Sequence, residues 1–177
     1  MPNIESSHYQ KEYSSLIPKS IKVTDVRADV SLYLFDNRIY LLVKDDNIVL
    51  GNITISQKLI NGKKYIHIDG IFLPIEYRKT SAPNWLIYAV KETMMIPVIA
   101  NGAIFSDGSD LIDAIIKHKV FNVSKLDVNT GEKLELTGKI NDPAYCYLFE
   151  SAKLGFNTRF FENMAVTWLP LFEEIII

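Results

Sequence analysis

The chain has 177 residues, of which 48% are hydrophobic and 23% charged, and this composition is ordinary for one globular domain with a sizeable core. Its 19 basic and 21 acidic residues leave a net charge of -2, which gives no electrostatic case for nucleic acid as the main partner. Cys146 has no second cysteine to pair with, which fits a reducing compartment, and a buried apolar filler is a better interpretation of it than a nucleophile.

The N-terminal sequence MPNIESSHYQKEYSS is too polar for a signal peptide. No apolar run approaches the roughly 18 residues that a membrane span needs. We therefore expect a soluble, cytoplasmic protein without a membrane partner.

The first half of the chain predicts mainly strands. Residues 1–20 are polar and are expected to be partly flexible. Residues 22–36 fit either a helix, since Val26, Val30 and Leu34 recur every four residues, or a strand, since VSLYLF is rich in β-formers. Segments 38–46, 47–59 and 63–73 are separated by turn signals at 45–47 and 61–62 and predict an antiparallel meander. Gly70 inside the last of these strands is typical of a bulge or a close backbone approach.

The second half predicts alternating helices and strands. Apolar residues recur at helical spacing over 83–95, where Pro83 suits the first turn and Pro97 ends the helix. We then expect a buried strand at 97–105, a capped helix at 106–119 and a hairpin formed by 120–128 and 132–140. After Pro143, residues 144–156 predict a helix that ends at Gly155, and 164–172 predict a last strand. This order predicts an α+β fold in which helices pack on a mixed sheet.

Two segments resemble the GNAT superfamily of acyl-CoA-dependent N-acyltransferases. Residues 40–55, YLLVKDDNIVLGNITI, resemble that family's second and third strands, and residues 70–92, GIFLPIEYRKTSAPNWLIYAVKE, resemble its fourth strand and third helix. Glu76, Tyr77 and Arg78 match the start of the family's hallmark, and Ser81 and Pro83 occupy its two small-residue positions. The resemblance covers residues 24–140 and includes the order of the elements.

The resemblance implies a single domain over residues 1–177, with an acyltransferase-like core at 24–140 and a C-terminal extension at 141–177. It implies a twisted, mainly antiparallel sheet, flanked by helices, whose fourth and fifth strands splay apart. The pantetheine of acetyl-CoA, or of another acyl-CoA, would lie in that gap, and its pyrophosphate would lie on the helix N-terminus. No metal is expected. The implied cofactor-binding residues are Ile71, Phe72, Leu73, Arg78, Lys79, Thr80, Ser81, Ala82 and Asn84.

Three positions depart from the family pattern. Ser81 adds a side chain where the phosphates should approach, and Pro83 removes one N–H donor, although nearby basic side chains could compensate. The tyrosine that protonates the leaving thiolate falls at Ile116, which cannot transfer a proton. Tyr147, in an imperfect repeat of the same motif, is the candidate to replace it.

Acyl transfer to an amine also needs a general base. His67 and Asp69 alternate with Tyr65 on one face of the predicted 63–73 strand, and Glu76 follows its end. The base is His67, Asp69 or Glu76, acting directly or through water, and the alternative is a solvated sheet face. Three further acidic residues are better explained by their position near a helix N-terminus than as the ligands of a metal site; they are Asp107, Asp110 and Asp113.

These features support two functions. The first is an N-acyltransferase, in the simplest case an acetyltransferase, that moves an acyl group from CoA to an amine by direct transfer with a general base. The second is a non-catalytic protein of the same fold that serves binding or assembly, in a virus or another particle. The apolar end EEIII would aggregate if left unpaired, so we expect it to be covered by this chain or by another, in a homo-oligomer or a larger assembly.

Overall fold

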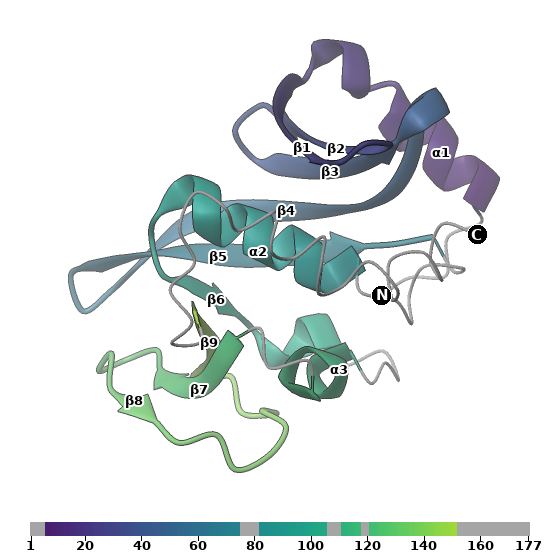
Figure 1. The fold of residues 1–177 in the computed structure, drawn as a ribbon. Coiled ribbons are helices and arrows are strands. Elements are labelled where there is room, and N and C mark those ends of the chain that lie inside the picture. The colour runs from purple at the N-terminus through teal and green to yellow at the C-terminus, as the bar shows by residue number, and fades with distance from the viewer. Residues whose placement is uncertain (1–5, 75–81, 106–110, 118–120, 152–177) are drawn as a thin grey trace.

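The computed structural model describes residues 6–74, 82–105, 111–117 and 121–151, coloured in Figure 1. The elements in chain order are α1 (Ser6–Ser14), β1 (Ile21–Arg27), β2 (Val30–Phe35), β3 (Ile39–Lys44), β4 (Ile48–Ile60), β5 (Lys63–Phe72), α2 (Ala82–Met94), β6 (Val98–Ala100), α3 (Leu111–Lys117), β7 (Phe121–Asp127), β8 (Lys133–Leu134) and β9 (Tyr145–Ser151). Short 3-10 turns lie at Ile17–Lys19, Asp45–Asn47 and Gly102–Phe105.

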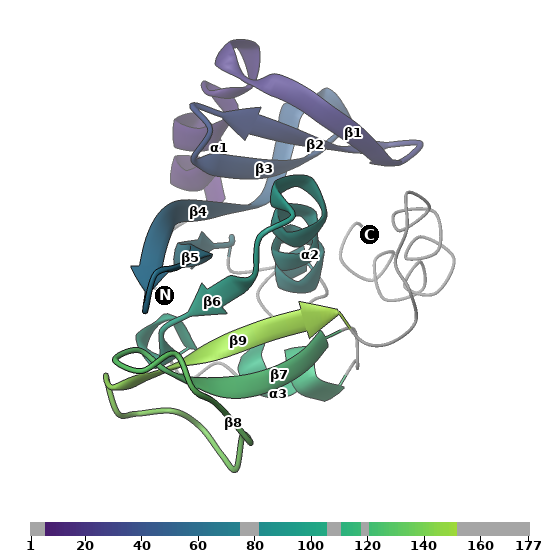
Figure 2. The ribbon, with the colours of Figure 1, turned by 90° about the vertical axis from the view of Figure 1, so that its left-hand side faces the viewer.

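The described strands form one nine-stranded sheet in the order β1-β2-β3-β4-β5-β6-β9-β7-β8. Neighbouring strands are antiparallel except for β5 and β6, which are parallel. Figures 1 and 2 show α1 beside β3 and β4 on one face, and α2 across the opposite face. Side chains of α2 and α3 share the main core, whereas Tyr9 of α1 belongs to a separate cluster. The predicted α+β fold, with a mixed and mainly antiparallel sheet flanked by helices, is confirmed.

The antiparallel meander expected from the turn signals is also confirmed. Asp46 and Asn47 have φ values of 68° and 60°, and Asn61 and Gly62 have φ values of 48° and 79°. Asparagine, aspartate and glycine are the residues that tolerate this left-handed conformation. In the ambiguous segment 22–36, VSLYLF forms β2, as its strand interpretation predicted, and the residues before it form β1, a strand that was not expected.

β5 contains a bulge at Asp69. Ile68 and Gly70 pair with successive residues of β4, which leaves Asp69 as an extra residue on its strand. Before the bulge the even-numbered side chains face the core beneath α2, and after it Ile71 and Leu73 do. The bulge therefore keeps apolar side chains on the α2 face, as expected from the glycine in this strand.

The predicted helix at 144–156 is wrong. Residues 145–151 form β9, which lies between β6 and β7 in the sheet. Successive side chains of β9, Cys146 to Phe149, are all buried, because they alternate between the main core and a smaller cluster on the other face of the sheet. A strand buried on both faces lacks the polar–apolar alternation that identifies strands in a sequence. The remaining predictions for this end of the chain, at 152–177, lie outside the described residues.

Three other boundaries differ from expectation. Residues 6–14 form helix α1 rather than a flexible segment. The strand expected at 97–105 is limited to Val98–Ala100 and is followed by a 3-10 turn. The second arm of the expected hairpin is reduced to Lys133–Leu134. Within the described segments, no helix combines the length and the apolar character needed to cross a membrane.

Gln10 attaches α1 to the sheet, because its side-chain amide makes the two hydrogen bonds that a neighbouring strand would make to Val49. Its Nε2 donates to the carbonyl of Val49 at 2.7 Å, and its Oε1 accepts from the N–H of Val49 at 2.8 Å. β5 ends opposite Asn52, so no described strand covers this part of the β4 edge. The amide of Gln10 therefore satisfies two backbone groups that would otherwise lack partners.

Replacing Gln10 by alanine is expected to lower the free energy of unfolding by about 2 kcal/mol, because both groups of Val49 lose their partners. Urea denaturation followed by circular dichroism measures this change. The matched control is Lys11→Ala on the next, exposed position of α1, which should change stability by less than about 0.5 kcal/mol. Equal stability of the two variants would contradict this role of Gln10.

Candidate functional site

The parallel strands β5 and β6 separate soon after they begin to pair. Their pairing is limited to Ile66 with Val98, His67 with Ile99 and Ile68 with Ala100. Beyond these pairs β5 continues to its end at residue 72, while the chain after β6 enters a 3-10 turn. β4 pairs with one edge of residues 70–72 and leaves Asp69 bulged, and no described strand pairs with the other edge of residues 69–72. The backbone of this stretch therefore faces a gap.

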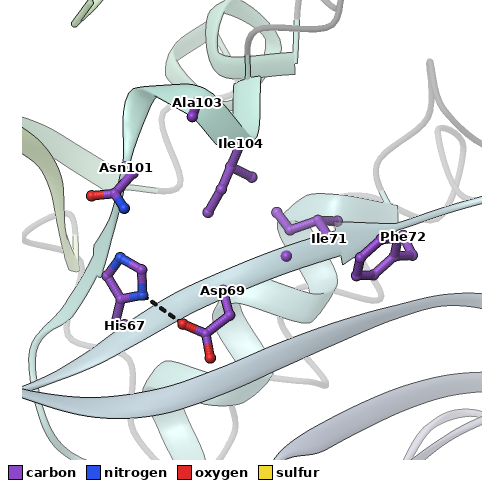
Figure 3. A pocket seen from close by; sticks show the side chains of 8 residues that line it. His67, Asp69, Ile71, Phe72, Asn101, Ala103 and Ile104 are labelled. Atoms are coloured by element: carbon purple, nitrogen blue, oxygen red, sulfur yellow. Dashed lines mark hydrogen bonds and ion pairs between the residues drawn. The ribbon is translucent and has the colours of Figure 1, made fainter. Parts of the chain in front are cut away.

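A cavity of about 290 Å³ lies in this gap. Figure 3 shows β5 forming one wall and the segment after β6 forming the other. The lining residues are His67, Asp69, Gly70, Ile71, Phe72, Asn101, Ala103 and Ile104. A Cβ at Gly70 would lie 2.6 Å from the ring of Phe72, so any larger residue would displace a ring that lines the cavity.

His67 and Asp69 form a hydrogen-bonded pair in the cavity wall, drawn as a dashed line in Figure 3. Nδ1 of His67 lies 2.7 Å from Oδ1 of Asp69, and the same oxygen accepts a hydrogen bond of 2.9 Å from the hydroxyl of Ser56. A carboxylate at Nδ1 favours the tautomer that leaves a lone pair on Nε2. Nε2 is buried and has no hydrogen-bond partner within the described part of the chain. The pair therefore leaves Nε2 with a lone pair that is shielded from solvent.

The two members of the pair differ in exposure. The side chain of His67 is 12% exposed and that of Asp69 is 38% exposed. Of the carboxylate oxygens of Asp69, only Oδ1 is engaged by the described residues. Asp69 thus connects the largely buried imidazole to solvent.

Only some of the residues expected to bind the acyl donor lie in the described part of the chain. Ile71 and Leu73 are buried in the core beneath α2, and the carbonyl of Phe72 accepts a hydrogen bond of 3.0 Å from the hydroxyl of Tyr9. Ala82 is the first residue of α2 and Asn84 lies in its first turn. The corner that would hold the phosphates lies outside the described residues, and so does the third candidate base; these positions are Glu76, Arg78, Lys79, Thr80 and Ser81.

Pro83 is buried as the second residue of α2, in the turn whose N–H groups have no intrahelical acceptor. The proline therefore removes one donor at the helix N-terminus without breaking a hydrogen bond of the helix. The edge of residues 69–71 that faces away from β4 has no described strand as a partner, so its backbone groups are available to an extended ligand.

Tyr147 lies on the opposite face of the sheet from His67. His67 is in register with Ile99 and Leu148, whereas Tyr147 is in register with the neighbouring position of β6 and faces α3. Its hydroxyl accepts a hydrogen bond of 2.8 Å from the N–H of Ile140. It lines a second cavity, of about 230 Å³, together with Ile116 of α3. The structure thus brings Tyr147 close to the position of the expected tyrosine but not to His67, and its role as the acid stays a prediction.

Two further candidates are explained by their surroundings. Burial raises the pKa of the Cys146 thiol to about 11, so it is protonated at neutral pH and does not act as a nucleophile. Asp113 is exposed and forms an ion pair of 3.6 Å with Lys139, while Asp107 and Asp110 lie outside the described residues. Across the described segments, no group of three or more His, Cys, Asp or Glu residues could hold a metal ion.

Sequence reasoning missed Ser56, Asn101 and Tyr9. Counting back from the Asn61–Gly62 turn would have placed Ser56 opposite His67, because the pairing of β4 with β5 is regular between these positions. Asn101 enters the site through the parallel pairing of β5 with β6, which no local pattern encodes. Tyr9 lies in a polar segment with no signal of burial.

Comparisons with known proteins give similarity at the level of solved structures. No family model matches the sequence, and no curated protein matches it. NAA60 of Arabidopsis thaliana, solved in complex with a bisubstrate analogue, is 15% identical over 69% of this chain and 74% of that chain, with a TM-score of 0.38. The N-terminal domain of the ribosomal-protein-alanine acetyltransferase of Clostridium acetobutylicum ATCC 824 is 14% identical over 75% of this chain and 97% of that chain, with a TM-score of 0.36.

Proposed function

We propose that the chain is an acyl-CoA-dependent N-acyltransferase, in the simplest case an acetyltransferase, that acts by direct transfer to an amine. The observation that carries this proposal is the His67–Asp69 pair in the wall of the gap between β5 and β6. The gap is the backbone feature that the sequence resemblance implies for the donor site, and the bulge at Asp69 lies in its wall.

The residues of the gap fit the acyl donor in two ways. The free edge at residues 69–72 can hydrogen-bond an extended amide chain, and Gly70 leaves room beside it. The N-terminus of α2 begins eight residues after Pro74 in the chain and would attract the anionic end of the donor.

The chemistry assigned to the chain is proton removal and positioning. An alkylammonium must lose one proton before it can attack, and the His67–Asp69 pair accepts that proton at the imidazole while the carboxylate stabilises the resulting positive charge. The donor supplies an activated thioester: the amine nitrogen forms the C–N bond as the C–S bond breaks, and the second amine proton goes to the departing thiolate. The hydrogen bond from Ser56 holds the Asp69 carboxylate in place.

Titration calorimetry of the full chain with acetyl-CoA tests the donor site. We expect saturable binding by the unaltered chain and its loss in Gly70→Val, because the added side chain would collide with the ring of Phe72. Gly138→Ala is the matched control, since a Cβ there meets no atom within 4 Å. No binding by the unaltered chain at millimolar ligand would overturn the proposal and favour a non-catalytic binding or assembly protein.

A further inference from the structure

A third cavity, of about 400 Å³, lies beside the His67–Asp69 cavity. Asn101 and Ala103 line both, so the segment after β6 is their common wall. The remaining residues of this third cavity come from β4, from the 3-10 turn after β6, and from the loop before β9 and its first residue; they are Lys58, Gly102, Ile140, Asn141, Asp142, Pro143 and Tyr145. A ligand in this cavity would lie next to the proton-accepting pair.

The third cavity carries one cation and one anion that do not neutralise each other. Lys58 pairs in register with Tyr65, which places it on the face of the sheet that carries His67. Asp142 uses Oδ1 to accept a hydrogen bond of 2.9 Å from the N–H of Ala144. Within the described residues no ion pair joins Lys58 or Asp142 to any other side chain.

An unpaired ammonium and an unpaired carboxylate on one cavity are complementary to a ligand that carries both charges. The head group of a free amino acid has this chemistry: its α-carboxylate would meet Lys58 and its α-ammonium would meet Asp142. A second amine at the end of the side chain could then extend past Asn101 towards His67.

We propose that the third cavity binds the head group of a free diamino acid, and that the side-chain amine of this ligand is the acceptor of the acyl group. Only the second part of this inference, that the side-chain amine accepts the acyl group, rests on the proposed N-acyltransferase activity. The binding of the head group depends on Lys58 and Asp142 alone and can be measured without an acyl donor.

The test is a titration of the full chain, followed by NMR, with L-lysine, 1,5-diaminopentane and Nα-acetyl-L-lysine amide. The second compound lacks the carboxylate, and the third lacks both charges of the head group. L-lysine should bind about ten-fold or more tightly than either, which is the effect of one charged hydrogen bond. Lys58→Met and Asp142→Asn should each weaken L-lysine binding by about ten-fold, whereas Lys64→Met, on the opposite face of the same hairpin, should not.

Three results would overturn the inference: no saturable binding of L-lysine, equal affinity for the diamine, or unchanged affinity in both cavity variants. Tighter binding of the amide would also overturn it, in favour of a peptide or protein acceptor. If the chain bound L-lysine as expected but did not bind acetyl-CoA, the head-group site would be supported and the proposed acyl transfer would be overturned.

Discussion

Replacing Asp69 by asparagine is expected to reduce kcat/KM for acyl transfer by about 100-fold or more, with little change in the affinity for acetyl-CoA. The amide cannot stabilise a protonated imidazole and no longer favours the tautomer that leaves Nε2 free. His67→Gln should have an effect of similar size, because it removes the imidazole itself. Steady-state kinetics that follow thiol release measure both variants, and calorimetry with acetyl-CoA separates donor binding from the chemical step.

Ser56→Ala and Asp36→Asn are the controls for this experiment. Ser56→Ala removes one neutral hydrogen bond to Asp69 and should lower the rate by about ten-fold or less. Asp36 is exposed in the β2–β3 turn and should have no effect. Activity of the Asp69 and His67 variants within about two-fold of the unaltered chain would exclude the pair as the base and would leave Glu76 as the remaining candidate.

Gly102→Ala is expected to cause the largest loss of stability of any single methyl addition proposed for this protein. A Cβ at this position would lie 2.0 Å from the carbonyl oxygen of Ile140. This neighbour is backbone and cannot rotate away, so the 3-10 turn and the loop before β9 would have to separate. Overpacking of this kind costs about 1–3 kcal/mol or more, and urea or thermal unfolding followed by circular dichroism measures it.

Gly138→Ala provides the comparison for Gly102→Ala, because both variants add the same methyl group. At Gly138 the added Cβ meets no atom within 4 Å, so stability should stay unchanged or rise slightly as the unfolded chain loses freedom. Gly102 and Ile140 both line the third cavity. Pushing them apart in Gly102→Ala should therefore also weaken L-lysine binding. Equal unfolding midpoints for the two variants would show that the segment after β6 does not pack against Ile140 as described.

The candidate site combines features that a sequence can reveal with features that it cannot. Period-two alternation along the 63–73 strand placed His67 and Asp69 on one face, and the glycine at 70 indicated the bulge, which the structure has at Asp69. The same reasoning could have reached Ser56 by counting back from the turn. Asn101 and Asp142 could not be found in this way, because they reach the two cavities only through the neighbours of β5 and the loop before β9.

The incorrect helix at 144–156 has a physical explanation of the same kind. Four successive residues of β9 are all buried, because Tyr147 and Phe149 join the main core while Cys146 and Leu148 join a smaller cluster on the other face of the sheet. A continuous apolar run does not distinguish a buried strand from a buried helix. The inserted position of β9 between β6 and β7, rather than its own sequence, makes it a strand.

The sequence by itself determined the antiparallel meander, helix α2, the bulge in β5 and the placement of His67 and Asp69 on one face, because each depends on residues close together in the chain. The tertiary structure alone decided where β5 and β6 separate, that Tyr147 faces away from His67, and that Lys58 and Asp142 line one cavity. These features depend on pairing between segments far apart in the chain, and that pairing is set by the burial of both faces of the sheet rather than by any local pattern.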